Sequence, residues 1–221
     1  PRDYTEDELR EIAEDLEKAV TVPVNVMLEA EHRVYDLSEV RELLRGVERI
    51  VLQDCVCKTE YGNCDSPTGV YLSLDRAAED TLATAEHRPQ EVSHDEALEA
   101  LKASHEAGLV HMAYMVRGIE RPTVICSCCP CCCHTLGVLM RFGVSTQVFT
   151  SKYVAEDDAE GCNDCGACVD RCVFNAGSIT DGQMAFDASS CFGCGLCVST
   201  CPSDAITLVS RGPATLNGSA E

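Results

Sequence analysis

Two segments of the sequence share one cysteine spacing: CNDCGACVDRC at residues 162–172 and CFGCGLCVSTCP at residues 191–202. In each run, two residues separate the first three cysteines and three residues precede the fourth. The second run starts 29 residues after the first. A doubled run of this kind is typical of a segment that binds two iron–sulfur clusters. Structural zinc is the weaker interpretation, because zinc usually takes its ligands from two well-separated Cys-x2-Cys pairs.

These residues resemble the bacterial ferredoxin domain that binds two [4Fe-4S] clusters. The resemblance implies a βαββαβ fold, and Asp181-Gly182 is a strong signal for a hairpin between its halves. It also implies crossed ligand sets, because the fourth cysteine of each run binds the cluster of the other run. One cluster would be held by Cys162, Cys165, Cys168 and Cys201, and the other by Cys172, Cys191, Cys194 and Cys197. Val173 departs from the family, in which a proline follows the first run.

The other nine cysteines lie upstream in two groups. These are Cys55, Cys57 and Cys64, and then Cys126, Cys128, Cys129, Cys131, Cys132 and Cys133. A total of 17 cysteines is odd, and adjacent cysteines are poorly suited to disulfides. In a reducing cytosol such a density of thiols indicates metal binding. Bound metal would also supplement the thin core of a chain without tryptophan.

The upstream groups resemble a family of bacterial and archaeal 4Fe-4S dicluster proteins. In that family a CxC(R/K)…CxxP…C segment and a GLVH…CNCCxCCC segment precede the ferredoxin repeat, as Cys55-Val-Cys57-Lys58 and Gly108-Leu-Val-His111 do here. The resemblance covers residues 22–210 and implies a further helical region before Pro1. Tyr71 stands where the family has another cysteine, so the first group has three thiols and no local fourth.

The nine upstream thiols allow several interpretations. We expect at least one additional iron–sulfur cluster between the two groups. Two cubanes with one spare thiol, one cluster with several free thiols, or a non-cubane centre all satisfy the count. Structural zinc with spare thiols is the alternative, and substrate chemistry at an open cluster is a third. His134 is a candidate ligand or hydrogen-bond donor, whereas His111 is expected to be structural or to supply protons.

Charge and hydropathy exclude several classes of function. The chain of 221 residues has 37 acidic and 17 basic side chains, a net charge of −20. Nucleic acid and anionic membranes are therefore unfavourable partners. No apolar stretch approaches the ~20 residues of a spanning helix and no signal segment opens the chain, so we expect a cytoplasmic protein without membrane insertion. Residues 156–210 carry nine acids and one arginine, which favours a redox partner with a basic docking face.

Hydrophobic periodicity predicts an α+β chain. We expect a mixed α/β, winged-helix-like, cysteine-rich module over residues 1–154, a βαββαβ dicluster ferredoxin domain over 155–210, and a mobile tail over 211–221. Helices are expected at 5–20, 38–46, 93–108 and 134–142, with another from Asp75 to before Pro89. Ser38 is the expected cap of the helix at 38–46, and Ser93 with Glu96 is the expected capping box of the helix at 93–108. Strands are expected at 22–26, 47–53, 109–116, 123–125 and 147–154, and the acidic residues 156–160 are expected to form the linker.

The sequence thus favours an electron-transfer protein or subunit that passes single electrons through two [4Fe-4S] clusters and at least one further cluster to a partner oxidoreductase. Nucleotide-binding and hydrolase motifs are absent, which argues against a self-contained enzyme. The alternative is a redox enzyme or reductive activator whose N-terminal cluster is the catalytic centre. A third hypothesis is a redox or oxygen sensor that works through protein contacts, because the acidic helix over 93–108 would not bind DNA.

Overall fold

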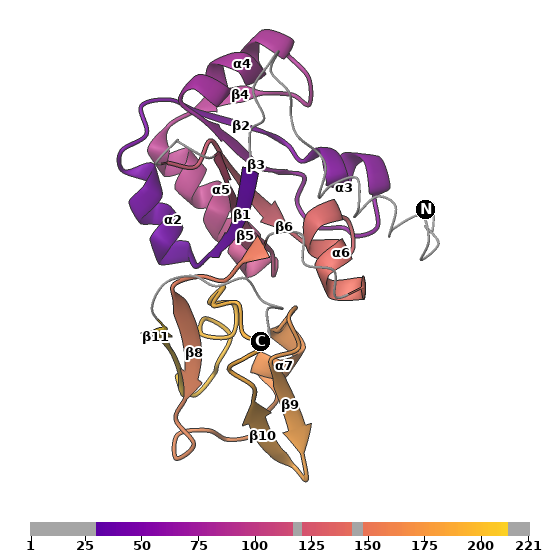
Figure 1. The fold of residues 1–221 in the computed structure, drawn as a ribbon, viewed down its shortest axis with the longest axis vertical. Helices are drawn as coiled ribbons and strands as arrows, with labels where there is room; N and C mark the ends of the chain where they lie inside the picture. Colours follow the sequence, from indigo (N-terminus) through magenta and orange to yellow (C-terminus); the bar gives the residue numbers. More distant parts are fainter. Residues whose placement is uncertain (1–29, 117–120, 143–147, 212–221) are drawn as a thin grey trace.

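The computed structural model describes residues 30–116, 121–142 and 148–211. The expected helix at 5–20, the expected strand at 22–26 and the tail from residue 212 lie outside these residues. Two units are stacked along the long axis of the molecule (Figure 1). The larger one contains the upstream cysteines, and the smaller one contains the cysteine repeat. The described chain is therefore a mixed α/β structure with the repeat at its C-terminal end.

A seven-stranded sheet forms the larger unit, in the order β4-β2-β3-β6-β5-β1-β7. All neighbours are antiparallel except β1 and β7, which are parallel. The strands are β1 (Ala30–Tyr35), β2 (Ile50–Asp54), β3 (Gly69–Leu74), β4 (Gln90–Val92), β5 (Val110–Val116), β6 (Val124–Cys128) and β7 (Val148–Phe149). The sheet is larger than the winged-helix-like module that the sequence suggested. The strands expected at 109–116 and 123–125 are β5 and β6 and form an antiparallel pair, but other strands extend the sheet on both sides of it.

Two helices cover one face of this sheet, α2 (Leu37–Leu44) and α5 (His94–Glu106) (Figure 1). Ser93 and Glu96 form the expected capping box of α5. The cap of α2 differs from the expected Ser38. Asp36 is the N-cap residue, and its side chain accepts hydrogen bonds from the backbone N–H groups of Ser38 and Glu39. Because this carboxylate satisfies these donors, the helix begins at Leu37.

The other face of the sheet carries the upstream cysteines. Two short helices flank them, α3 (Val56–Tyr61) and α6 (His134–Phe142) (Figure 1). A further helix, α4 (Arg76–Thr84), packs near β3 and β2. Asp75 precedes α4 as expected but makes no side-chain cap. Its carboxylate instead accepts hydrogen bonds from the backbone N–H groups of Glu48 and Arg49, which tie the start of α4 to the loop before β2.

The alternation of side chains along the central strands separates the two faces. Met112 on β5 and Cys126 on β6 belong to the apolar cluster that contains the thiols. Their neighbours Ala113 and Ile125 belong to the cluster under α2 and α5. Successive residues of a strand point to opposite faces. The pattern Val-Ile-Cys-Ser-Cys at residues 124–128 therefore directs both of its cysteines to the face opposite α5.

The smaller unit consists of two pairs of antiparallel strands around the cysteine repeat. Its elements are β8 (Tyr153–Asp157), α7 (Ala167–Arg171), β9 (Gly177–Thr180), β10 (Gln183–Phe186) and β11 (Ile206–Ser210). β8 pairs with β11, and β9 pairs with β10 across the expected Asp181-Gly182 turn. The expected second helix is a turn at residues 196–200. There the Ser199 and Thr200 hydroxyls donate to the carbonyl of Leu196 and compete with helical hydrogen bonding.

The connection between the units also differs from expectation. The expected strand at 147–154 is two strands, β7 in the large sheet and β8 in the small unit. Between them, Thr150 and Ser151 are fully buried. Two acids of the expected linker, Glu156 and Asp157, belong to β8 and pair with β11. The chain therefore passes between the units through buried residues, and the acidic run lies on β8 and the loop after it.

Candidate metal centres

The two cysteine runs adopt the same backbone conformation. Left-handed residues recur 29 positions apart as Asp164 and Gly193, Gly166 and Gly195, and Asn175 and Asp204, all with φ between 52° and 77°. In both runs a backbone N–H two residues further on donates to the sulfur of the first cysteine. These are the bonds from Asp164 to Cys162 (3.4 Å) and from Gly193 to Cys191 (3.3 Å). The sequence repeat is therefore a structural repeat as well, with N–H groups turned toward sulfur.

Five cysteines of the repeat line one apolar cavity: Cys168, Cys172, Cys191, Cys194 and Cys197. All of them except Cys168 are residues that the ferredoxin resemblance assigned to one cluster. The rings of Phe174 and Phe192 stack at a centroid distance of 4.2 Å in the cavity wall. Glycine is required at position 193, because its φ is +70° and an added Cβ would lie 2.1 Å from the carbonyl oxygen of Tyr153. A tightly wrapped, apolar, thiol-lined cavity fits a [4Fe-4S] cluster.

The four cysteines that the resemblance assigned to the other cluster include the most exposed one of the repeat. Cys165 is exposed, and Cys162, Cys168 and Cys201 are half-buried. By contrast, Cys191 and Cys194 are buried. Burial raises the pKa of the Cys194 thiol, and a hydrogen bond with Ser203 lowers the pKa of Cys201. If each set holds a cluster, one lies near solvent and the other lies inside the molecule.

The nine upstream thiols come together but fall into two groups. Four sulfur atoms, those of Cys64, Cys129, Cys131 and Cys132, all lie within 4.8 Å of one another. We call these residues the four-thiol group. Across the described ranges 30–116, 121–142 and 148–211, this is the one convergence of three or more potential metal-binding side chains within that distance. The eight cysteines of the repeat are thus more widely spaced, as a multi-iron cluster requires.

The other five upstream cysteines form a closed ring of interacting thiols, which we call the five-thiol ring. Around the ring, the order is Cys55, Cys126, Cys128, Cys133 and Cys57. The sulfur atoms of Cys55 and Cys126 are 4.0 Å apart. Hydrogen bonds from Cys126 and then Cys57 lower the pKa of Cys55 to about 2. Hydrogen bonds from Cys128 and Cys57 likewise lower the pKa of Cys133. The ring therefore favours thiolates at these two positions, and the thiolate is the form that binds metal.

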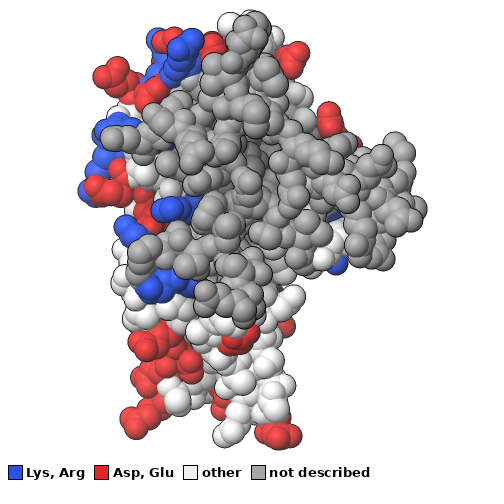
Figure 2. Space-filling view, in the orientation of Figure 1, with Lys and Arg blue, Asp and Glu red and all other residues white. Residues whose placement is uncertain are grey.

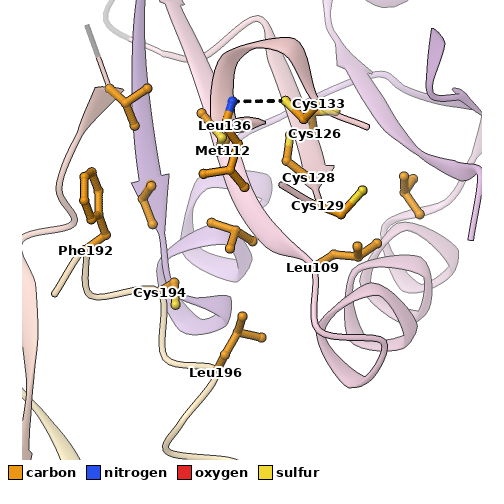
Figure 3. Packing of buried hydrophobic residues seen from close by; sticks show 14 of the residues in the cluster. Leu109, Met112, Cys126, Cys128, Cys129, Cys133, Leu136, Phe192, Cys194 and Leu196 are labelled. Atoms are coloured by element: carbon orange, nitrogen blue, oxygen red, sulfur yellow. Dashed lines mark hydrogen bonds between the residues drawn. The ribbon is translucent and has the colours of Figure 1, made fainter. Parts of the chain in front are cut away.

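Strand alternation and a turn explain this division. Cys126 and Cys128 point to one face of β6 and join the five-thiol ring, while Ser127 points to the other face. β6 ends at Cys128, and the turn at Pro130 redirects the next cysteines toward Cys64. Cys133 then returns to the ring at the start of α6, where the backbone N–H of Leu136 donates to its sulfur (Figure 3).

A buried cation lies among these thiols. Lys58 is 5% exposed, and its Nζ donates to the carbonyl oxygen of Ser127 at 2.5 Å. Burial alone would lower the pKa of Lys58, but the negative charge of Cys55, Cys128 and Cys126 outweighs it and raises the pKa. This role of Lys58 was not predicted from the sequence. The signal was a lysine directly after a Cys-x-Cys pair, which predicts a cation within reach of clustered thiolates.

Three other residues singled out in the sequence can now be placed. Tyr71 faces the thiols and is paired in register with Cys126, and burial raises its pKa. His111 is 1% exposed and lies on the α5 side, where its Nδ1 is 3.0 Å from the hydroxyl of Ser127. This placement favours the structural role over proton supply to the thiols. His134 packs its ring against that of Tyr61, with centroids 4.7 Å apart, and is not a member of the four-thiol group.

The joint between the units lies next to the buried cysteines of the repeat. Cys194 and Leu196 pack in the same apolar cluster as Leu109, Met112 and Cys129 (Figure 3). Polar contacts surround this core. Arg171 Nη2 donates to the carbonyl oxygens of His105 (2.6 Å) and Glu106 (2.8 Å), and Ser151 Oγ donates to Glu39 Oε2 at 2.7 Å. Cys194 thus faces the unit that holds the upstream thiols.

Part of the chain matches a known protein family, although no curated protein matches the chain at a significant level. No helix in the described part of the chain is long and apolar enough to span a membrane. All 17 cysteines are free thiols. Residues 184–207, which contain most of β10 and the second cysteine run, match the family model described as 4Fe-4S binding domain. The C-terminal unit therefore carries a 4Fe-4S binding domain.

Proposed function

We propose that this chain is an iron–sulfur electron-transfer protein that holds two [4Fe-4S] clusters in its C-terminal unit. The observation that carries the proposal is the apolar cavity that brings Cys172, the fourth cysteine of the first run, together with Cys191, Cys194 and Cys197 of the second run. Cys168 of the first run also lines this cavity. The clusters supply one-electron redox chemistry when bound. The protein's part is to hold their ligands, donate N–H groups to sulfur and exclude water around the buried set.

The five-thiol ring is the proposed site of a further iron–sulfur centre. Its thiols are buried or half-buried and favour the thiolate form at Cys55 and Cys133. Lys58 supplies a positive charge that would offset part of the negative charge of such a centre. The apolar core that these thiols share with Cys194 supports electron exchange between the units without a path through solvent.

The proposed partner is an oxidoreductase with a basic docking face. On the face shown in Figure 2, acidic side chains gather along one edge and at the tip of the C-terminal unit, whereas the visible rim of the larger unit shows both signs. Three acids of the C-terminal unit are Glu156, Asp157 and Asp158, which precede Cys162, the first cysteine of the repeat, by only a few residues in the sequence. Such a field raises the association rate of a basic partner and weakens with salt. Seventeen free thiols further support a reducing compartment, the cytosol.

Iron analysis and low-temperature EPR during anaerobic reductive titration test the proposal. We expect at least about eight irons per chain and signals from two interacting [4Fe-4S] clusters. Paired variants test the crossed ligand sets. Cys172→Ser with Cys191→Ser should remove one cluster, because both residues are assigned to the same set. Cys172→Ser with Cys162→Ser should remove both clusters.

Fewer than about eight irons in the anaerobically purified protein would overturn the proposal. Equal iron loss in the two double variants would overturn the crossed assignment while leaving the function intact. Because the two double variants carry the same number of substitutions and share Cys172→Ser, each controls for the general effect of losing two thiols.

A redox enzyme or reductive activator is the second candidate function. It is favoured by a partly open pocket lined by Cys131, Cys132 and His134, which places two thiols and an imidazole together. Its test is turnover of the reduced protein with small oxidants, compared with a His134→Ala variant that leaves the cysteines in place. Oxidation rates that are equal in the two proteins would count against a catalytic role for this cavity.

A further inference from the structure

The four-thiol group differs from the other cysteines in its spacing. The sulfur of Cys64 lies 3.7 Å from those of Cys129 and Cys132, and the sulfurs of Cys131 and Cys132 are 4.0 Å apart. All four sulfurs fall within 4.8 Å of one another. They come from two loops far apart in the sequence, the one between α3 and β3 and the one between β6 and α6.

This spacing fits one metal ion and is too small for a cubane. Four sulfurs at about 2.3 Å from a tetrahedral zinc ion stand about 3.8 Å from one another. A [4Fe-4S] cluster has a separate iron beneath each thiolate, so its four cysteine sulfurs must spread much more widely. Tetrahedral four-sulfur sites in proteins hold either zinc or iron–sulfur centres. Because the spacing excludes a cubane, a single tetrahedral ion is the centre that fits. A single iron ion would have the same geometry; zinc is the usual structural ion in such a site, and metal analysis distinguishes the two.

The surroundings hold this group in place. Asn63 Nδ2 donates to the carbonyl oxygen of Cys131 at 2.8 Å, and Arg141 Nη2 donates to the same oxygen at 3.2 Å. These bonds hold the turn that presents three of the four sulfurs. Lys58, whose pKa the charge of Cys129 helps to raise, offsets negative charge from the same side. A tetrathiolate zinc site has a net charge of −2, so a nearby buried cation is favourable.

We propose that Cys64, Cys129, Cys131 and Cys132 bind one zinc ion as a structural tetrathiolate site, separate from the iron–sulfur centres. The ion joins the α3–β3 loop to the β6–α6 loop. In doing so it orients Cys57 at the start of α3 and Cys133 just before α6, both members of the five-thiol ring. The nine upstream thiols then serve two centres of different kinds. This assignment is independent of the electron-transfer proposal.

The test is metal analysis and zinc K-edge X-ray absorption of the full-length, anaerobically purified chain. We expect about one zinc per chain with four sulfur neighbours at about 2.3 Å. A Cys64→Ser variant should lose the zinc and keep the iron and EPR signals of the C-terminal clusters. The matched control is Cys57→Ser, which removes a thiol of the five-thiol ring and should keep the zinc.

Several results would overturn the assignment. Among them are wild-type protein without stoichiometric zinc, zinc with nitrogen or fewer than four sulfur neighbours, and a Cys57→Ser variant that loses zinc while Cys64→Ser retains it. The absorption spectrum of the wild-type protein decides the matter even if a variant does not fold. Loss of iron from the C-terminal unit would instead bear on the proposed function, so the two failures are distinguishable.

Discussion

The C-terminal and N-terminal cysteines are brought together in two different ways. In the repeat, each run of four cysteines spans eleven residues, and left-handed residues such as Gly166 and Gly195 wrap the chain around its site. In the larger unit, thiols separated by about seventy positions meet only because β2, β3 and β6 are neighbours in the sheet. A local site can form with its own loop, whereas an assembled site depends on the whole sheet.

This difference sets what each region contributes to stability. In the proposed outer ligand set, Cys165 is exposed, and Cys168 and Cys201 pack against a small cluster within the C-terminal unit. Loss of this set should therefore be confined to that unit. Cys172 and Cys194 share one apolar core with the upstream thiols, so damage there should spread across the joint. Bound metal adds to folding free energy at both places. Four sets of substitutions test this difference between the two regions, and they are given in order of decreasing expected effect.

The largest effect is expected from cysteines of the repeat that differ in burial. Cys194→Ser and Cys165→Ser should each remove one cluster, about four irons per chain. Only Cys194→Ser should also loosen the joint, because it places a hydroxyl in the shared core. Iron analysis and thermal unfolding measure the two effects. Equal falls in Tm for the two variants would contradict the difference in coupling.

Removing the buried cation should strongly destabilise the assembled thiol site. Lys58→Met leaves the thiolates around it uncompensated, and breaking a buried ion pair costs about 3–5 kcal/mol. That corresponds to a fall of roughly 10 °C in the Tm of a chain this long. The reduction potential of the upstream centre should also fall, because the lost positive charge favoured the reduced form. The control is Lys102→Met at an exposed position of α5. An unchanged Tm and potential for Lys58→Met would show that the cation is not coupled to the thiols.

Cutting the polar clamp across the joint should have an intermediate effect. Arg171→Ala removes two charge-assisted hydrogen bonds to carbonyl oxygens at the end of α5, with an expected cost of about 1–3 kcal/mol. Faster proteolysis between the units should accompany the lower Tm. The matched control is Arg45→Ala, whose side chain is 75% exposed and forms an ion pair with Glu42. If both variants behave alike, the joint does not depend on this clamp.

The smallest effect concerns the face of the sheet opposite the thiols. Burial, with the charge of His105, lowers the pKa of His111 to about 3, compared with about 6.5 in an unfolded chain. Between these two pKa values, His111 is therefore protonated in the unfolded chain and neutral in the folded chain. Stability should be complete above pH 6.5 and decline as pH falls toward 3, by about 0.7 kcal/mol per unit near pH 6.5. His111→Gln should reduce this slope in thermal unfolding between about pH 7.5 and 5.5. An identical slope in the variant would assign the acid sensitivity to other groups.

Much of the local structure could be predicted from the sequence. The capping box of Ser93 and Glu96, the Asp181-Gly182 turn and the helix at 134–142 were predicted, because each depends on neighbours in the chain. The errors arose where other groups compete for the same backbone. Asp36 caps α2 in place of Ser38, the hydroxyls of Ser199 and Thr200 replace a helix with a turn, and β7 and β8 pair with different partners.

The sequence by itself determined that this is a thiol-rich, metal-binding chain with a doubled cysteine run, since the spacing within each run is short enough to act locally. Only the tertiary structure decided how the nine upstream thiols divide into a group of four and a ring of five. It also placed Lys58 among them and brought Cys194 to the joint. The physical reason is that strand order and register, which no local pattern encodes, decide which distant sulfurs share a face of the sheet.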